Sequence, residues 1–199
     1  DVPPGPLTSG AEPCHAGVAW RWDGVDFRFL HPPPAATAGG NDSSCVLLIA
    51  GRGGRTLLSG DIEAPAEARL AAGGIDLGAD LVVAPHHGSR TSSTPAFVAA
   101  TAPRWVVVPA GYGNRWGFPA PEVSARWRGV GAGIWVTGEE GAVEVEFGPT
   151  GVARPPTGWR CAARRFWRRA DCPPGRVPGP PDSQYHAPDP ELPLSGPEG

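Results

Sequence analysis

Hydrophobic and polar residues alternate in the first third of the chain, which is the pattern of half-buried β-strands. In VAWRWDGVDFRFL, which begins at Val18, apolar side chains occupy every second position on both sides of Asp23-Gly24. An Asp-Gly pair between two alternating runs is typical of the tight turn of a β-hairpin. A second pair of short apolar runs, 45–50 and 56–58, flanks a turn of glycine and arginine. The pattern therefore predicts two hairpins in succession.

Beyond residue 60, unbroken apolar runs alternate with helix-forming segments. DLVVAP (80–85) and RWVVVPAG (104–111) contain consecutive apolar residues, which is typical of buried strands. Three segments are predicted to be helices: 62–74, 93–103 and 120–129. The first is rich in helix-forming residues and ends at glycine, and the other two have a proline near the start. GIWVT and AVEVEF are expected to be the last strands. The predicted fold class is α/β.

Composition divides the chain into a globular region and two flanks. Residues 1–13 are rich in proline and glycine, and we expect a flexible lead-in. The hydrophobic share of 40% supports one globular domain over 14–148. Residues 149–199 are rich in Pro, Gly and Arg and are expected to be disordered. Arginine and aromatic residues alternate between 158 and 172, which suits single-stranded nucleic acid or an anionic membrane but is also typical of a solvated basic tail.

Charge, cysteines and hydropathy narrow the classes of function. A net charge of −3 excludes a surface that is basic throughout, so a nucleic acid would have to be held locally. No apolar run approaches the ~20 residues that span a bilayer, so the chain itself is expected to be soluble. It begins at Asp1 and has no methionine, so we interpret it as a fragment of a longer protein. Its cysteines lack zinc-finger spacing; Cys161 and Cys172 could form a disulfide or remain free thiols.

Side chains able to bind a metal follow two of the predicted strands. Asp61 follows LLSG, and the pair His86-His87 follows LVVAP. Open α/β sheets bind ligands at strand ends, and carboxylate and imidazole groups converging there could hold two metal ions. Because neighbouring side chains of an extended strand point to opposite faces, we expect only one of the histidines to be a ligand. Each group taken alone is more typical of a turn or strand end without chemistry.

The hydroxyl residues after the histidines admit two interpretations. Ser89, Thr91, Ser92 and Ser93 precede the predicted helix that starts near Thr94. Hydroxyl and backbone N–H groups at the start of a helix can bind a phosphate. The same residues can simply cap the helix, which is the commoner outcome.

Four segments, by their order and spacing, resemble the C-terminal metallo-β-lactamase-like domain of ComEC, the DNA-internalisation protein of bacterial competence. They are NDSSCVLLI (41–49), LLSGDIE (57–63), ADLVVAPHHGSRTSS (79–93) and GNRWGFPAPEV (113–123). The resemblance covers roughly residues 18–147. It implies a partial metallo-β-lactamase-like αββα sandwich with a metal site at one edge. At matching positions the resemblance implies Asp61 and either His86 or His87 as catalytic and metal-binding residues, and Asn114 and Arg115 as residues that line the same edge. The expected substrate-binding residues, which would contact a DNA phosphate, are Ser89, Arg90, Asn114 and Arg115.

Two features depart from the family pattern. The superfamily binds metal mainly through an HxHxDH segment before the NDSS strand, and this chain contains no HxH. Phe118 occupies a position where a histidine is common, and phenylalanine cannot bind metal. One carboxylate and one or two imidazoles are fewer than the three or more donors of a stable zinc or manganese site. We therefore expect a divalent metal (Zn or Mn) in the complete domain and possibly none in this fragment, which is expected to be inactive alone.

The resemblance implies a role in DNA uptake. The longer protein would be a channel in the bacterial cytoplasmic membrane, with this domain on its outer face hydrolysing DNA phosphodiesters. The expected partners are DNA, single-stranded or being converted to it, and the channel portion of the same protein, with no small-molecule cofactor. Two alternatives stay open: a catalytically inactive module that guides DNA, and another hydrolase of the same fold acting on esters or lactams. A half sandwich would expose apolar area that a partner sheet normally covers, so we expect marginal stability.

Overall fold

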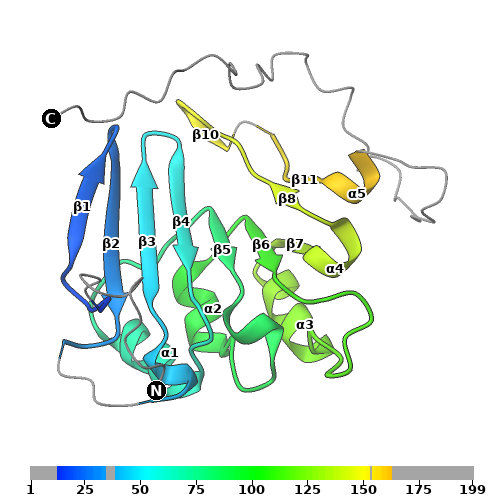
Figure 1. Ribbon diagram of the computed structural model, residues 1–199, viewed down its shortest axis with the longest axis horizontal. Helices are drawn as coiled ribbons and strands as arrows, with labels where there is room; N and C mark the ends of the chain where they lie inside the picture. Colours follow the sequence, from blue (N-terminus) through cyan, green and yellow to red (C-terminus); the bar gives the residue numbers. More distant parts are fainter. Residues whose placement is uncertain (1–12, 35–38, 153, 163–199) are drawn as a thin grey trace, which may run out of the picture.

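The computed structural model describes residues 13–34, 39–152 and 154–162 of the chain. Its main feature is a seven-stranded sheet in the order β1-β2-β3-β4-β5-β6-β7 (Figure 1). The pairs from β1 to β4 are antiparallel and the pairs from β4 to β7 are parallel. The predicted α/β class is confirmed in this general form: a mixed sheet with helices.

The antiparallel half consists of the two predicted hairpins. These strands are β1 (Ala19–Trp22), β2 (Val25–His31), β3 (Val46–Gly51) and β4 (Gly54–Leu58). Trp22 pairs with Val25, and the two residues between them, Asp23 and Gly24, have φ angles of 46° and 77°. Positive φ at both central positions is what a tight hairpin turn requires, which explains why Asp-Gly predicted it.

In the parallel half, each strand is connected to the next by a helix. The elements are α1 (Ala64–Ala72), β5 (Leu81–Val83), α2 (Pro95–Thr101), β6 (Trp105–Val108), α3 (Pro121–Gly129) and β7 (Gly133–Val136). All three predicted helices are present. Right-handed crossovers that advance in one direction place their helices on one face of a sheet. Accordingly α1, α2 and α3 lie together behind the sheet in Figure 1.

The hydrophobic core lies between the sheet and these helices. Val82 and Val106 of the central strands are fully buried against Phe97 of α2 and Trp127 of α3, all with 0% exposure. Val123 lies one helical turn before Trp127 and is also fully buried. The spacing of four between these two residues therefore puts both on the covered side of α3.

The opposite face of the sheet, which we call the open face, is also apolar. Strand register places one row of side chains on it, from β2 to β6: Phe29, Leu47, Leu58, Val83 and Val107. All five are only half-buried, whereas Val106 beside Val107 is completely covered. Trp20 and Trp22 of β1 are 42% and 73% exposed. Within the described residues there is no second large sheet over this face.

Regular structure continues past residue 148, where we expected the tail to begin. The elements are α4 (Thr137–Glu140), β8 (Val143–Glu144), β9 (Phe147–Gly148), β10 (Gly151–Val152), β11 (Thr157–Gly158) and α5 (Trp159–Ala162). The segment AVEVEF forms two short strands in place of one, because β8 pairs with β11 and β9 with β10. Most of the arginine-aromatic segment 158–172 lies outside the described residues, as does the lead-in up to residue 12.

A disulfide that the sequence did not predict joins Cys14 to Cys45, with 6.0 Å between the Cα atoms. It ties the segment before β1 to the start of β3. Cys161 is also disulfide-bonded, and Cys172 lies outside the described residues. In the part of the chain that the structure describes, the helices are too short or too polar to cross a membrane.

Candidate functional site

The candidate site lies at the carboxyl ends of β4 and β5. These strands are parallel neighbours, with Leu58 paired to Val83, so the segments that follow them emerge at the same edge of the sheet. The backbone N–H of His86 donates to the carbonyl of Gly60 (3.1 Å), which joins the two segments. As a result, Asp61 Oδ1 lies 3.6 Å from His87 Nε2. The structure thus brings together the carboxylate and an imidazole that the sequence singled out.

The two histidines do not continue the strand. β5 ends at Val83, and Pro85–Gly88 forms a 3₁₀ turn in which His86 and His87 have φ angles of 46° and 56°. Left-handed backbone at two successive non-glycine residues is costly and tends to occur at functional sites. The expectation that the two rings point to opposite faces of a strand is therefore wrong. Their ring centroids lie 6.1 Å apart, and each ring faces a carboxylate.

His87 is held in one orientation by the backbone. Its Nδ1 lies 2.9 Å from the carbonyl oxygen of Pro109, which can only accept, so Nδ1 carries the hydrogen. In the neutral ring, Nε2 then presents its lone pair toward Asp61. The backbone N–H of Asp61 in turn donates to Ser44 Oγ (3.1 Å). An imidazole fixed through one nitrogen by a carbonyl is the usual arrangement of a metal-binding histidine.

His86 belongs to a second cluster, which sequence reasoning missed. Its Nδ1 lies 3.0 Å from Glu63 Oε1 and 3.1 Å from Thr91 Oγ1. Glu63 Oε1 also accepts hydrogen bonds from the Thr91 hydroxyl (2.9 Å) and from Asn41 Nδ2 (3.2 Å). The bond from Thr91, and after it the one from Asn41, holds the pKa of Glu63 below its ordinary value. The sequence offered one signal for this cluster, which is the position of its members: Glu63 lies two residues after Asp61, and Asn41 begins the NDSS segment.

These residues do not complete a metal site by themselves. A zinc ion in a protein has at least three protein donors. Among the described residues, no group of three or more His, Cys, Asp or Glu side chains is arranged to hold a metal ion. Phe118 lies beside both imidazoles, with ring centroids 6.1 Å from His86 and 6.4 Å from His87, and offers no donor. The described residues therefore supply pairs of donors and fall short of a full coordination shell.

The start of α2 is occupied by a carboxylate of the protein. Glu67 of α1 is fully buried, and it accepts hydrogen bonds from the backbone N–H groups of Ser93 (2.5 Å) and Thr94 (2.7 Å). Thr94 is the N-cap, with Oγ1 accepting from the N–H of Phe97 (3.4 Å). Two donors that a phosphate would need are thus already bound, so the structure supports the capping interpretation of this segment.

Ser89 and Arg90 are engaged with neighbouring side chains. The Ser89 hydroxyl is buried and lies 3.0 Å from the hydroxyl of Thr91. The Nε of Arg90 donates to Glu122 Oε1 at 2.5 Å, and the Arg90 side chain remains 71% exposed. Arg90 is therefore the more accessible of these two expected phosphate contacts.

Asn114 and Arg115 lie on the loop 111–119, which we call the aromatic loop. Both ends of the Asn114 side chain are used by the loop: Nδ2 donates to the carbonyls of Gly111 (3.0 Å) and Phe118 (2.7 Å), and Oδ1 accepts from the N–H of Phe118 (2.8 Å). Asn114 therefore holds the loop in shape. The guanidinium of Arg115 lies over the ring of Trp116, 4.6 Å from its centroid.

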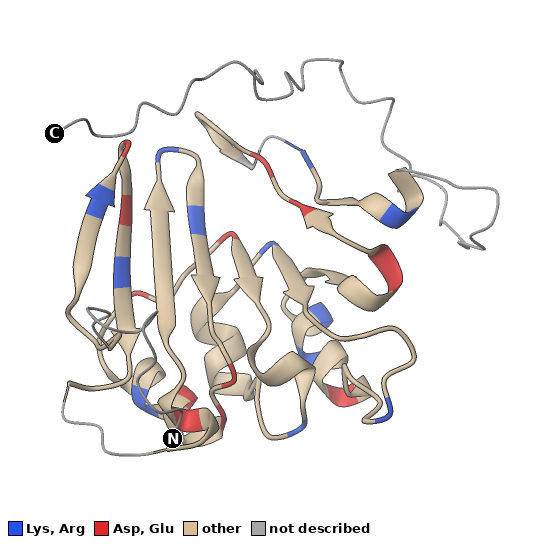
Figure 2. Cartoon of the chain, in the orientation of Figure 1, with Lys and Arg blue, Asp and Glu red and all other residues tan. Residues whose placement is uncertain are grey.

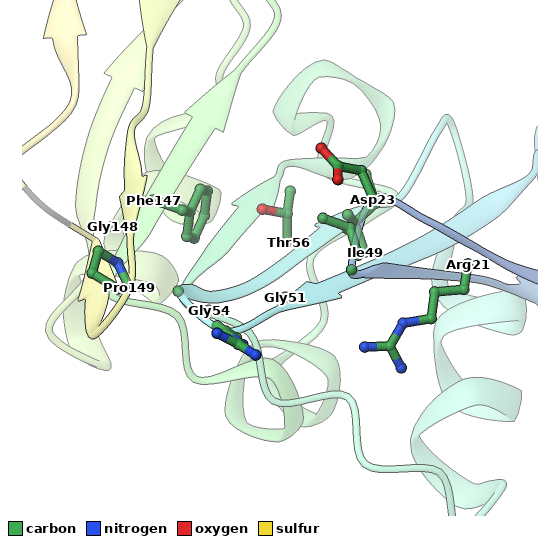
Figure 3. A pocket seen from close by; sticks show the side chains of 13 residues that line it. Arg21, Asp23, Ile49, Gly51, Gly54, Thr56, Phe147, Gly148 and Pro149 are labelled. Carbon is green, nitrogen blue, oxygen red and sulfur yellow. The ribbon is translucent and has the colours of Figure 1, made fainter.

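A pocket of about 650 Å³ lies at the other end of the strands (Figure 3). It is formed by the turns of both hairpins and by Phe147–Pro149, and it contains Arg21 and Asp23 but no histidine. In the view of Figure 2, acidic and basic residues are interspersed along the chain.

Comparison with known proteins identifies relatives among much longer chains. No family model matches the sequence. The chain is 37% identical over 144 residues to Competence protein ComA of Neisseria gonorrhoeae, covering 72% of this chain and 21% of that protein. It is 33% identical over 135 residues to Recombination protein 2 of Haemophilus influenzae (67% and 17%) and 32% identical over 155 residues to Uncharacterized protein YcaI of Escherichia coli (77% and 20%).

The chain thus spans about a fifth of the length of these relatives. These relatives, one of which is named for competence, are therefore similar to most of this chain but extend far beyond it. Together with the four sequence segments, these similarities support a relationship of this chain to ComEC-type competence proteins.

Proposed function

We propose that this chain is a domain of a ComEC-like DNA-internalisation protein and that, within the complete protein, it takes part in metal-dependent hydrolysis of DNA phosphodiesters. The observation that carries the proposal is the pair Asp61–His87, whose facing atoms are 3.6 Å apart at the ends of two parallel strands. This distance is too long for a good hydrogen bond. Both side chains are accessible, at 43% and 44% exposure, so a ligand can reach them.

The metal centre in this proposal is shared with another part of the longer protein. Asp61 and His87 contribute two donors, and the remaining donors for Zn²⁺ or Mn²⁺ come from outside the described residues. The open face of the sheet supports this division, because its half-buried apolar row is suited to pack against a second layer. Such a second sheet would complete an αββα sandwich and bring its own donors to the same edge.

The same proposal places the domain outside the cytoplasm, attached to the membrane channel portion of the protein. Disulfides persist in oxidising compartments and are rare in the cytosol of ordinary bacteria. The pair Cys14–Cys45 is therefore in keeping with the outer face of the cytoplasmic membrane. The partner in this proposal is DNA, as expected from the resemblance of the four sequence segments to ComEC.

The test compares the full-length protein with Asp61→Asn and His87→Gln variants, with His15→Gln as the matched control. Loss of a residue that merely supports a ligand costs about 10- to 100-fold in metal affinity or activity, so loss of a ligand should cost at least as much. We expect both variants to lose bound metal, measured by mass spectrometry of the purified protein, and to cleave a labelled oligonucleotide at least about tenfold more slowly. The control should match the wild type. Equal metal content and cleavage in all four proteins would refute the assignment.

One observation favours a second function, that of a catalytically inactive module that guides DNA. Phe118 places an apolar ring beside both imidazoles, where a further donor would be needed. In this case the full-length protein binds DNA, but the wild type itself takes up neither zinc nor manganese and leaves the oligonucleotide intact. The metal measurement on the wild type therefore separates the two functions.

A further inference from the structure

We propose that Trp116 and Arg115 form a platform that binds one unpaired nucleotide, with the base stacked on Trp116 and its phosphate paired with Arg115, and that this platform leads the strand to the Asp61–His87 pair. The inference rests on the proposed function for the identity of the polymer. Beyond that function, the inference names the residues that recognise the DNA strand and the feature of the strand that they recognise, which is an exposed base.

Trp116 is an exposed aromatic residue on a fixed loop. Its side chain is 63% exposed, although it lies only two residues from the partly buried Phe118. The hydrogen bonds of the Asn114 side chain to Gly111 and Phe118 close the loop on both sides of Trp116. The ring is therefore presented to solvent by a loop that the Asn114 side chain holds in shape. Tryptophan combines a large apolar ring with a polar N–H group and is enriched at interfaces, so this ring is suited to contact a partner.

The aromatic rings continue from Trp116 to the candidate site. Trp116 and Phe118 are stacked with 6.3 Å between centroids and 14° between planes, and Phe118 and His87 with 6.4 Å and 25°. Nearly parallel rings thus run from the exposed end of the loop to the imidazole that faces Asp61. A base stacked on Trp116 would extend this row outward and place the neighbouring nucleotides along the edge that carries the Asp61–His87 pair.

Charge on the loop fits a phosphate backbone. The Arg115 guanidinium lies over the Trp116 ring, with its Cζ atom 4.6 Å from the ring centroid. A base that stacks on this face takes the place of the guanidinium, which then moves to the side of the ring, where its N–H groups can pair with the phosphate. Tyr112, 79% exposed, has the guanidinium of Arg160 at 5.6 Å from its ring and repeats the combination on the same loop. Aromatic faces interleaved with arginine bind single strands with little dependence on sequence, because every base has a face to stack. In a duplex the faces of the bases are covered by neighbouring base pairs, so the platform should select unpaired bases.

The test measures binding of the 199-residue chain to labelled oligonucleotides by fluorescence anisotropy. The probes are an oligothymidine of about 16 nucleotides, an abasic strand of the same length and the corresponding duplex. Stacking on one base contributes about 5- to 150-fold in affinity, so Trp116→Ala should weaken binding of oligothymidine by this factor and leave binding of the abasic strand unchanged. Trp116→Phe should retain most of the affinity. Arg115→Ala should weaken binding of both strands and reduce the dependence on salt.

Trp22→Ala is the matched control, because Trp22 is at least as exposed as Trp116 (73% against 63%) but lies on β1 at the far edge of the sheet. It should bind all probes like the wild type. The proposal is overturned if the wild type does not bind oligothymidine, if it binds the duplex or the abasic strand equally well, or if Trp116→Ala has no more effect than the control. If the full-length protein cleaves DNA but the binding test fails, the platform alone is refuted. A functional platform in a protein that neither binds metal nor cleaves DNA would refute hydrolysis alone.

Discussion

At the scale of single residues, the two adjacent histidines differ in what binds their Nδ1 atoms. His87 Nδ1 is bound by a backbone carbonyl, whereas His86 Nδ1 faces the carboxylate of Glu63. A carbonyl leaves the opposite nitrogen of His87 free for a ligand. The carboxylate makes His86 part of a hydrogen-bonded cluster with Glu63, Thr91 and Asn41. His87 is therefore the better candidate to bind a ligand, and His86 the better candidate to hold the site in shape.

The Glu63 cluster allows a prediction about one carboxyl group. Thr91→Val removes the hydroxyl whose hydrogen bond is the main reason that the pKa of Glu63 is lowered, so this pKa should rise toward its ordinary value. Because the folded pKa is lowered, ionised Glu63 favours folding above its ordinary pKa, and this contribution is lost as the pH falls through the folded value. Carboxyl ¹³C NMR measures the change, with Glu122 of the same sample as internal control. An unchanged Glu63 titration would show that Thr91 does not set it.

Sequence could predict Asp61 and His87 because both follow buried strands, and strand ends meet at one edge. It could not predict their partners. The contact of His87 with the carbonyl of Pro109 depends on a left-handed turn, and short motifs of side chains do not specify that backbone conformation. Glu63 was missed because it is the N-cap residue of α1, and a carboxylate at the start of a helix is usually solvated.

At the scale of elements, Glu67 joins α1 to the start of α2. Its fully buried carboxyl group accepts the N–H groups of Ser93 and Thr94. The indole N–H of Trp127 on α3 donates to Ser93 Oγ (3.2 Å), so all three helices meet at this point. The turn that carries the histidines is connected as well, because the Ser92 hydroxyl donates to the carbonyl of Pro85 (2.9 Å). The position of the site thus depends on the helix junction behind it.

Burial raises the pKa of Glu67, which gives this junction a specific pH dependence. A raised folded pKa means that the contribution of Glu67 to stability is complete below its ordinary pKa and is lost as the pH rises through the folded value. Glu67→Gln removes this titration and leaves one N–H without an acceptor, at a cost of about 1–3 kcal/mol. We expect the stability deficit of the variant, measured by urea unfolding, to be largest at low pH and to shrink as the pH rises.

Glu122→Gln provides a control of opposite sign. The pKa of Glu122 is lowered, first by its own backbone N–H and then by Arg90, so its contribution is present above its ordinary pKa and is lost as the pH falls. The deficit of this variant should therefore grow with pH. A Glu67→Gln deficit that also grows with pH would contradict the assigned role of burial.

The elements that were predicted best from the sequence are those that are determined by a few residues within the element itself. The Asp-Gly turn and the prolines that begin α2 and α3 act on the local backbone, and these elements are present where they were expected. AVEVEF alternates like one strand but forms two, because its two ends pair with different strands, β11 and β10. Both partners come from a segment rich in Pro and Gly. Pairing with a segment that has no strand pattern of its own cannot be found from local alternation.

At the scale of the whole molecule, the two faces of the sheet differ in how well they are covered. Helices cover one face, and the apolar row from Phe29 to Val107 on the open face remains half-buried. Parallel strands such as β5 and β6 ordinarily have both faces covered. Their unbroken apolar runs are therefore suited to pack against a second layer, and the relatives, of whose length this chain spans about a fifth, have ample chain to provide one.

Val106 and Val107, neighbours on β6, test this second layer directly. Val→Thr keeps the shape and adds a hydroxyl, so Val106→Thr should destabilise the chain by about 1–3 kcal/mol, because Val106 is completely buried. Val107→Thr on the open face should cost less than about 0.5 kcal/mol in the same chain. In the longer protein the cost at Val107 should approach that at Val106, as measured by urea unfolding of both forms. Equal costs in the short chain would mean that the face is already covered, and an unchanged Val107 cost in the longer protein would mean that nothing packs on it.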